Sequence, residues 1–162
     1  TGKGTHEFLL DEAGKWILSR EGIRMGERGM KEKDNDSKFY GSGGLENEWT
    51  PQHSWFISQL RGEGYKPRYS GALVADVNQV LMKGGGVFAY PGSMKKPQGK
   101  LRLLVELQPT AFLMENARGR ATDGIENILD KVPTSLDQRS QIYIGSRYEI
   151  GLAGEYLQKA EA

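Results

Sequence analysis

The segment Lys100–Glu106 (Lys-Leu-Arg-Leu-Leu-Val-Glu) combines two cations and a carboxylate with apolar residues at alternating positions. We expect it to be a β-strand, in which successive side chains point to opposite faces. Lys100, Arg102 and Glu106 then share one face, and the opposite face is fully apolar. Arg and Lys bind phosphate oxygens, and Glu supplies a hard oxygen ligand for a metal ion. The segment therefore predicts a phosphate and a metal ion side by side, although its pattern also fits a strand with a solvated charged face.

A second candidate is the run Arg68–Leu73 (Arg-Tyr-Ser-Gly-Ala-Leu), at the expected start of a helix near Gly71. The free backbone N–H groups and the positive end of a helix favour anions there, and glycine lets the backbone approach a ligand closely. Arg68 and Tyr69 add a cation and a hydroxyl. The run predicts an anion site, but it also fits an ordinary helix entry that contains glycine.

Other polar residues carry weaker signals. Tyr90 ends an expected strand before the basic pair Lys95–Lys96, where its hydroxyl can meet a ligand or simply cap the core. The run Gly41–Gly44 lacks the lysine-and-hydroxyl ending of a phosphate-binding P-loop, so we interpret it as a flexible loop. His6 and His53 lack the spacing of metal ligands, and no Ser/His/Asp arrangement stands out.

The elements that must position these residues alternate along the chain. Apolar periodicity and the turn and cap residues predict strands at 8–10, 16–18, 87–90, 101–107 and 141–144, and helices beginning near 50, 71, 109 and 146. Ser146 and Glu149 fit a capping box. The charged stretch 24–38 reads as a solvated loop that continues through residue 44. Interleaved strands and helices indicate one α/β layered domain over residues 1–162, a mixed β-sheet flanked by helices.

Composition narrows the function classes. The 162 residues include 22 basic and 21 acidic residues, so the formal net charge is +1 and gives no general attraction to nucleic acid or to anionic membranes. The sequence has no cysteine, which excludes disulfides and thiolate metal sites within it. No apolar run approaches the roughly 20 residues of a membrane span. We expect a soluble, intracellular protein without a nucleic-acid or membrane partner.

Three linked motifs carry a family resemblance: Arg68–Val77, Gly85–Pro91 and Gly99–Glu106. In their order and spacing they resemble the C-terminal half of class I fructose-1,6-bisphosphatases and the related sedoheptulose-1,7-bisphosphatases. The agreement continues at Pro109, 114–117, 123–124, 130 and 138–139, and it covers nearly the whole chain. The resemblance implies the C-terminal domain of the sugar-bisphosphatase fold.

The resemblance also implies roles for the residues near the reacting phosphate. Glu106 matches a glutamate that ligates metal beside the scissile phosphate, and Arg102 matches an arginine near the phosphate that is removed. Lys100 and Tyr90 match residues that hold the sugar and its distal phosphate, and Tyr69 matches another contact to that phosphate. The implied reaction is the Mg²⁺-assisted attack of water on the 1-phosphate.

Further implied roles concern the sugar and the assembly. Gly71, Ala72 and Leu73 match a backbone stretch that lies against the sugar. Arg68 matches an arginine that reaches into the site of a neighbouring subunit, so the full-length protein is expected to be a homodimer or homotetramer.

The substrate is left open between two sugars. Runs such as Gly4–Leu10, Asp76–Gln79 and Asp137–Gln141 look more like the sedoheptulose-1,7-bisphosphatases, whereas Tyr90–Pro91 looks like the fructose enzymes. The residues favour sedoheptulose 1,7-bisphosphate slightly, and dual specificity fits as well.

The acidic metal cluster of the family belongs to an N-terminal half that this sequence lacks. We therefore expect the chain alone to bind sugar phosphate weakly and to turn over negligibly, as part of an enzyme that is cytoplasmic or, alternatively, in a plastid. A standalone, non-catalytic sugar-phosphate-binding module is the second hypothesis, and the retention of Glu106 favours the enzyme.

Overall fold

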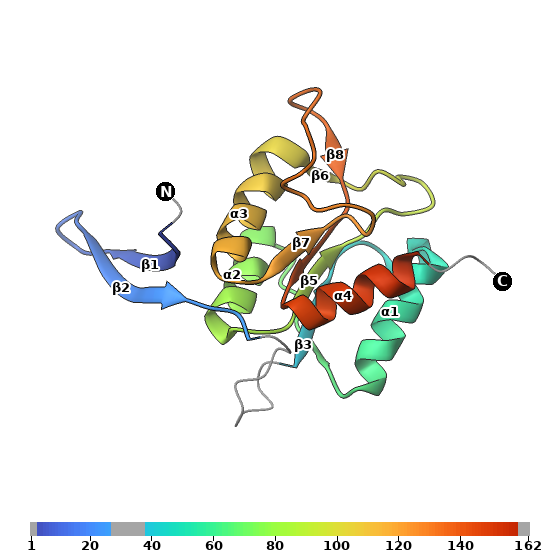
Figure 1. Cartoon of the computed structure of the whole chain (residues 1–162), viewed down its shortest axis with the longest axis horizontal. Coiled ribbons are helices and arrows are strands. Elements are labelled where there is room, and N and C mark those ends of the chain that lie inside the picture. The colour runs from blue at the N-terminus through green and yellow to red at the C-terminus, as the bar shows by residue number, and fades with distance from the viewer. Residues whose placement is uncertain (1–2, 27–37, 159–162) are drawn as a thin grey trace.

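A computed structural model describes residues 3–26 and 38–158 of the chain (Figure 1). Most of the loop predicted at 24–38 lies outside these residues. The strands are β1 (Thr5–Leu10), β2 (Trp16–Ile23), β3 (Phe39–Ser42), β4 (Lys66–Pro67), β5 (Val87–Tyr90), β6 (Leu101–Arg102), β7 (Arg120–Thr122), β8 (Arg139–Ser140) and β9 (Ile142–Gly145). The helices are α1 (Pro51–Gly62), α2 (Leu73–Lys83), α3 (Gln108–Asn116) and α4 (Arg147–Leu157), with a 3-10 turn η2 (Glu46–Glu48) and a π-helical turn η3 (Leu103–Leu107).

The central sheet has five strands in the order β4-β3-β5-β9-β7. The pairs β3–β4 and β3–β5 are parallel, whereas β9 is antiparallel to both β5 and β7. The strands β6 and β8 form a separate two-stranded pair. The prediction of an α/β domain with a mixed sheet flanked by helices is confirmed.

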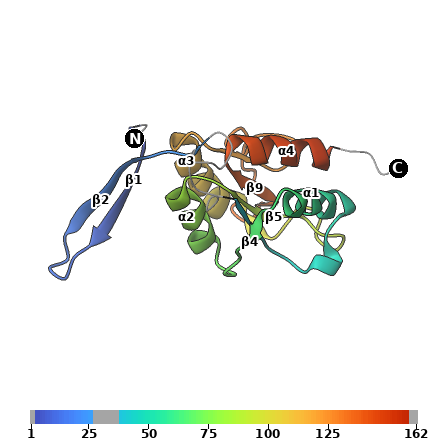
Figure 2. The ribbon, with the colours of Figure 1, turned by 90° about the horizontal axis from the view of Figure 1, so that it is seen from below.

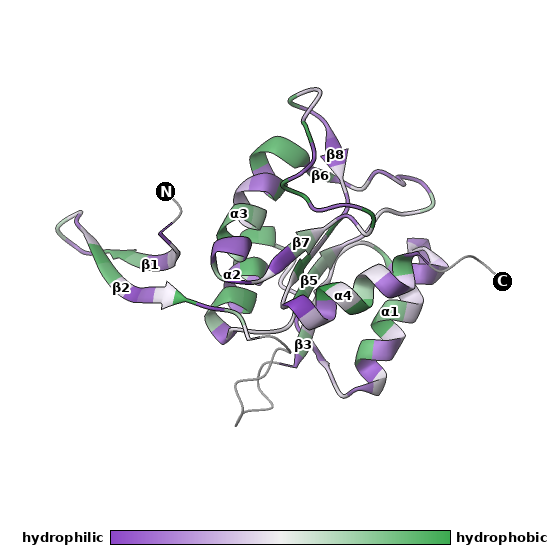
Figure 3. Ribbon diagram, in the orientation of Figure 1, coloured by the Kyte–Doolittle hydropathy of each residue, from purple (hydrophilic) through white to green (hydrophobic). Residues whose placement is uncertain are grey.

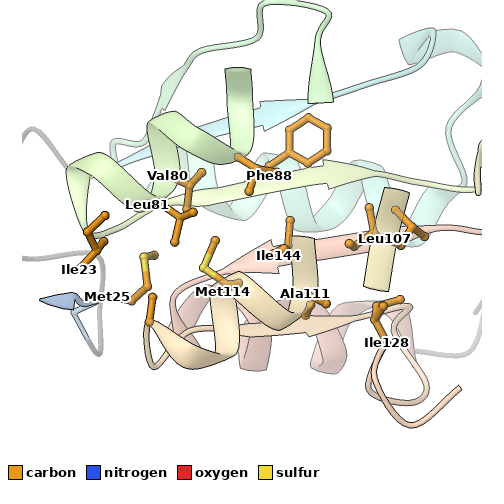
Figure 4. Close-up of a cluster of buried hydrophobic side chains, with 14 of the residues drawn as sticks. Ile23, Met25, Val80, Leu81, Phe88, Leu107, Ala111, Met114, Ile128 and Ile144 are labelled. Atoms are coloured by element: carbon orange, nitrogen blue, oxygen red, sulfur yellow. The ribbon is translucent and has the colours of Figure 1, made fainter. Parts of the chain in front are cut away.

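Helices cover both faces of the central sheet. Because side chains alternate along a strand, Phe88 of β5 and Ile144 of β9 face one side, while Val87 and Tyr143 face the other. The first side packs against α2 and α3, and the second against α1 and α4. Figure 4 shows the first cluster, in which Val80, Leu81 and Met114 point toward one another. The sheet is therefore the middle of three layers.

Local signals set several helix ends. Thr50 caps α1 by accepting a hydrogen bond from His53 N, with Pro51 at the first helical position, as predicted. Gly84 ends α2 in the left-handed conformation at φ 67°, which glycine adopts without strain. Ser146 is the N-cap of α4, but its side chain makes no capping hydrogen bond, so the predicted capping box is wrong.

Two predicted elements differ from the structure. The loop expected through residue 44 is wrong, because Phe39–Ser42 forms β3 inside the central sheet. The strand expected at 101–107 is wrong beyond Arg102, because the chain turns into η3 and continues into α3. Leu103 and Leu107 are fully buried, whereas Val105, which a strand would place on the same face, is 49% exposed, so the burial follows a helical turn and not a strand.

The predicted strands at 8–10 and 16–18 are confirmed as an antiparallel hairpin, β1–β2, which forms a sheet of its own. Asp11 and Gly14 close the turn at its tip, with Gly14 N donating to Asp11 O at 3.0 Å. The hairpin projects away from the layered domain (Figure 2). Within residues 3–26 and 38–158, no helix has the length and apolar character needed to cross a membrane.

Candidate functional site

Three parallel strands, β4, β3 and β5, end at one edge of the central sheet. Their carboxyl ends lead into Arg68 and Tyr69 after β4, Gly43 after β3, and Tyr90 at the end of β5. Ligands of open α/β sheets bind outside the carboxyl ends of the strands. The topology therefore brings the two predicted sites, which lie far apart in the sequence, to the same edge.

A cavity of about 360 Å³ opens at this edge, and we call it the Lys100 cavity. Tyr90 and Lys100 both line it, as do two further cations, Lys95 and Lys96. Its other lining residues are Gly44, Leu45, Glu48, Trp49, Pro91, Gly92, Ser93 and Gly99. The cavity thus combines apolar and aromatic walls with several positive charges, an arrangement suited to an anionic metabolite.

Hydrogen bonds hold the loop 91–100 that carries these lysines. Gly92 N donates to Gln141 Oε1 at 2.9 Å, and Met94 N donates to Glu48 O at 3.2 Å. The Lys95 ammonium forms an ion pair with the Glu48 carboxylate. Gln141 and Glu48 come from segments distant in the sequence, and Lys96 N also donates to Ser93 O within the loop at 3.0 Å, so tertiary and local contacts together fix the cavity wall.

Gly43 determines where the Tyr90 ring can lie. A Cβ atom added at Gly43 would stand 2.3 Å from Tyr90 Cδ2, a distance that no side chain tolerates. The carbonyl oxygen of Gly43 also accepts a hydrogen bond from Trp49 Nε1 at 3.0 Å. The glycine run predicted to be a flexible loop is therefore a packing surface for two aromatic residues of the Lys100 cavity.

Glu106 and Arg102 form a pair, but not through the strand alternation that was expected. Glu106 Oε2 accepts hydrogen bonds from Arg102 N at 2.8 Å and from Arg102 Nε at 3.1 Å, across one helical turn. Partial burial opposes ionisation of Glu106, but these bonds and the charges of Arg102 and Arg139 outweigh it and hold its pKa below the ordinary value. Glu106 is therefore a pre-oriented, ionised carboxylate near neutral pH.

Lys100 lines the Lys100 cavity and also contacts the segment that carries the Arg102–Glu106 pair. The guanidinium of Arg139 on β8 donates to the carbonyl oxygen of Lys100, and Arg139 pairs with Arg102 in the register of β6 and β8. Lys95, Lys96, Lys100 and Arg139 also share a neighbouring hollow. The cations at this edge outnumber its carboxylates, so the edge attracts anions although the whole chain is nearly neutral.

Arg68 and Tyr69 line a different cavity of about 310 Å³, together with Asp76 and others. Burial raises the pKa of Tyr69, and nearby Tyr90 and Asp76 add to the rise, so the phenol stays protonated. The Arg68 guanidinium stacks over the ring of Phe39 with 5.4 Å between its carbon and the ring centre. Neither Arg68 nor Tyr69 lines the Lys100 cavity.

The helix entry after Tyr69 offers fewer free donors than predicted. Ser70 N donates to Asp76 Oδ1 at 2.9 Å, and Ala72 N donates to Ser70 Oγ at 3.2 Å. Gly71 has φ 86°, Ala72 is the N-cap of α2, and the side chain of Leu73 packs against the core. Asp76 Oδ2 is buried without a hydrogen-bond partner among the described residues, so an unused carboxylate oxygen also lies at this helix entry.

The structure thus brings Tyr90 and Lys100 into one cavity, with the Arg102–Glu106 pair in the segment that follows Lys100 and with Arg68 and Tyr69 in a separate cavity. Sequence reasoning missed the contributions of Trp49, which bonds to Gly43, and of Glu48 and Gln141, whose partners lie 47 and 49 residues away along the chain and leave no local signal.

The described residues do not by themselves fit a magnesium site. Magnesium prefers an octahedral set of oxygen ligands with one or two carboxylates, often shared with substrate phosphate. In the part of the chain that the structure describes, no group of three or more His, Cys, Asp or Glu residues can hold a metal ion. Glu106 also already uses Oε2 in its pair with Arg102.

Fold and site together define an α/β domain with cationic cavities at the carboxyl edge of its parallel strands. Residues 33–158 match the family described as "Fructose-1-6-bisphosphatase, C-terminal domain". Among curated proteins, the chain is 46% identical over 156 residues to the class 1 fructose-1,6-bisphosphatase of Geobacter sulfurreducens, covering 96% of the chain and 47% of that protein. It is 44% identical to the enzyme of that name from Trichlorobacter lovleyi (98% and 48% covered) and 43% identical to that of Nostoc punctiforme (97% and 43%).

The chain therefore belongs to the fructose-1,6-bisphosphatase family, and its matched part is the C-terminal domain of that family. It spans about half the length of the curated relatives that it matches. The family expected from the three linked motifs is confirmed.

Proposed function

We propose that this chain is the sugar-phosphate-binding half of a sugar bisphosphatase, which hydrolyses one phosphate monoester of a sugar bisphosphate. The observation that carries the proposal is the Lys100 cavity, in which Tyr90 and Lys100 meet two further lysines at the carboxyl edge of the parallel strands. A cavity with an aromatic wall that gathers three lysines in a nearly neutral chain is suited to a phosphorylated sugar.

In this proposal the two ends of the substrate meet different groups. Lys100 and the Tyr90 hydroxyl hold the distal phosphate, and Tyr69 assists from the neighbouring cavity. Arg102 lies near the phosphate that is removed, where water attacks phosphorus and the bond from phosphorus to the sugar oxygen breaks, giving inorganic phosphate and a sugar monophosphate.

Glu106 contributes one carboxylate to the reacting end of the site. Because the described residues do not fit a magnesium site alone, the proposed Mg²⁺ dependence requires further carboxylates from outside them. The expectation that the isolated chain turns over negligibly follows from this incomplete ligand set. Steady release of phosphate by the isolated, contaminant-free chain would contradict it.

Fructose 1,6-bisphosphate is the first substrate to test, because the matched relatives carry the name fructose-1,6-bisphosphatase. The sedoheptulose-like runs of the sequence keep sedoheptulose 1,7-bisphosphate as the second candidate. In a complete enzyme that contains this chain, the ratio of the two kcat/KM values discriminates between the sugars.

The binding step can be tested on this chain alone by nuclear magnetic resonance. Titration of the isotope-labelled chain with fructose 6-phosphate is expected to shift the backbone signals of Tyr90, Gly99 and Lys100. The Lys100→Met variant should bind at least about tenfold more weakly, because it loses a charge-assisted contact of roughly 1.5–3 kcal/mol. Lys15→Met, which removes a lysine at the hairpin turn, is the matched control and should leave the affinity unchanged.

Two control ligands separate the contributions of the phosphate and of the sugar. Unphosphorylated fructose tests recognition of the sugar alone, and inorganic phosphate tests recognition of the phosphate alone. Fructose 6-phosphate is expected to shift the signals of the Lys100 cavity at lower concentration than either. Shifts confined to other cavities, or equal affinity of Lys100→Met and wild type, would refute the assignment of this cavity.

The role of Arg68 between subunits is a separate part of the proposal. In a complete oligomeric enzyme, Arg68→Ala is expected to raise KM by weakening the contact to the distal phosphate. An unchanged KM would remove Arg68 from the site.

A further inference from the structure

A second cavity, of about 500 Å³, lies between helix α4 and the strand β7 at the edge of the central sheet. Five residues of α4 line it, at spacings that place them on one face of the helix: Arg147, Ile150, Gly151, Gly154 and Gln158. β7 and the loop that follows it form the opposite wall. We call this the Arg147 cavity. It shares no lining residue with the Lys100 cavity, and its volume is typical of small-molecule sites.

Two arginines converge on one end of the Arg147 cavity. Arg120 begins β7 and lies opposite Gly145 of β9 in the register of the sheet. Arg147 begins α4 only two residues after Gly145. Since paired residues of antiparallel strands have Cα atoms about 4.5–5.5 Å apart, the two arginines start from neighbouring points. Figure 3 shows the hydrophilic colouring at the beginnings of β7 and α4.

Three charged side chains that line the Arg147 cavity are unpaired in the described part of the chain. Arg120, Arg147 and Glu115 form no side-chain hydrogen bond or ion pair there. The fourth charged group of the cavity, Glu126, is instead paired with Lys131 Nζ at 2.8 Å. Two cations and one carboxylate that line the same cavity without pairing are available to a ligand that carries groups for both.

Glycine leaves the α4 wall of the cavity bare. Gly151 and Gly154 lie inside the helix, where glycine is less favourable than alanine. A Cβ atom added at either position would have no neighbour within 4 Å, so packing among the described residues does not require glycine there. The two glycines keep the helix backbone open to an occupant of the cavity.

We propose that the Arg147 cavity binds a small phosphate monoester that carries hydroxyl groups. A phosphate monoester is close to a dianion at pH 7, which matches two arginines, and their planar guanidinium groups fit its oxygens. A hydroxyl group beside the phosphate donates to the Glu115 carboxylate, and the carbon chain lies on the glycine wall. This site is separate from the Lys100 cavity, and the inference does not depend on the proposed function.

Titration of the isotope-labelled chain with glycerol 3-phosphate, followed by nuclear magnetic resonance, tests the site. The backbone signals of Gly151 and Gly154 are expected to shift together and to saturate. Arg120→Met and Arg147→Met should each weaken binding at least about tenfold, or about 1.4 kcal/mol. Arg118→Met is the matched control, because Arg118 belongs to the same turn but does not line the cavity, and it should leave the affinity unchanged.

Three further ligands separate the chemical groups. Glycerol lacks the phosphate and should not bind measurably. Glycerate replaces the phosphate with a singly charged carboxylate and should bind at least about tenfold more weakly. Methyl phosphate keeps the phosphate but has no hydroxyl group on carbon. Glu115→Met should therefore weaken glycerol 3-phosphate at least about threefold and leave methyl phosphate unaffected.

A substitution in the helix separates binding from folding. Gly151→Leu fills the space above α4 and should weaken glycerol 3-phosphate at least about tenfold, while leucine raises the helix propensity and therefore the urea midpoint of unfolding. Four results would each overturn the proposal: shifts confined to the Lys100 cavity, shifts scattered over all basic residues, glycerate binding as tightly as glycerol 3-phosphate, or wild-type affinity in Arg147→Met or Gly151→Leu.

Discussion

The strands β5 and β9 and the hairpin strands β1 and β2 all carry runs of three or more consecutive apolar or aromatic residues, yet their surroundings are opposite. Val87, Phe88 and Ala89 are at most 1% exposed, whereas Phe8, Leu9 and Leu10 are more than 50% exposed. The difference lies in what covers the strands, since α1 to α4 cover both faces of the central sheet and no described element covers the hairpin faces. An apolar run in a strand thus does not by itself decide whether the strand is buried, because burial depends on the elements that pack against its faces.

The largest expected difference between the two regions comes from one substitution made at two places. Phe88→Ala removes a fully buried ring from the first core cluster and should lower the free energy of unfolding by about 3–5 kcal/mol. Phe8→Ala removes a half-exposed ring from the hairpin and should lower it by less than about 1 kcal/mol. Urea or guanidinium unfolding of both variants measures the contrast, and similar losses would show that the hairpin belongs to the same cooperative unit.

A buried histidine gives the sheet region a pH dependence. His53 is fully buried, with Nε2 2.9 Å from Ser42 Oγ and Nδ1 2.9 Å from Tyr143 OH. Burial lowers the pKa of His53 to about 3. Because the unfolded chain takes up the proton near pH 6.5 and the folded chain does not, stability contributed by the neutral ring is lost as pH falls from about 6.5 toward 3.

Because of His53, the free energy of unfolding should therefore fall by about 2–3 kcal/mol between pH 7 and pH 4.5. Unfolding experiments at these two pH values compare wild type with His53→Gln, which has no titrating ring. The variant is expected to be less stable at pH 7 but to lose less stability on acidification. Equal losses in both proteins would show that His53 accepts a proton without unfolding.

A carboxylate hydrogen bond can also be compared between the two regions. In the sheet region, Tyr65 OH donates to Glu149 Oε1 at 2.7 Å in a buried setting, and burial raises the pKa of Glu149. Tyr65→Phe leaves that carboxyl oxygen without its donor and should lower the free energy of unfolding by about 1–2 kcal/mol. In the hairpin, Ser19→Ala removes the exposed bond to Glu7 and should lower it by less than about 0.5 kcal/mol. A larger loss from Ser19→Ala would contradict the view of the hairpin as a separate unit.

Local chemistry allowed much of this fold to be predicted from the sequence. Thr50 with Pro51 and Gly84 mark helix ends through contacts within a few residues, so their signals are visible in the sequence. The strand predicted at 101–107 was wrong because its alternating apolar residues imitate a strand, whereas in the structure Leu103 and Leu107 are buried and Val105 between them is exposed. No local pattern distinguishes the two cases.

The prediction of a flexible loop for the glycine run Gly41–Gly44 was wrong for a different physical reason. A Cβ atom at Gly41 would stand 2.7 Å from Arg68 O, so this glycine allows neighbouring backbones to approach and does not signal a flexible loop. The Lys100 cavity shows the same limit, since Lys100 and Tyr90 were predicted from motifs while Glu48 and Gln141 act through contacts about 45–50 residues away along the chain. Long-range contacts of this kind are set by topology.

The smallest expected effect tests the comparison most sharply. Leu9→Thr with Ile17→Thr should change the unfolding free energy of the isolated chain by less than about 0.5 kcal/mol, because both side chains already face water and threonine preserves strand propensity. Chemical unfolding followed by tryptophan fluorescence of Trp49 and Trp55, in a Trp16→Phe background, reports on the sheet region without signal from the hairpin. A nearly silent pair would support the view of the hairpin as a unit separate from the sheet region. A loss of several kcal/mol in the isolated chain would instead show that the hairpin stabilises its own domain, and the contrast between the two regions would fail.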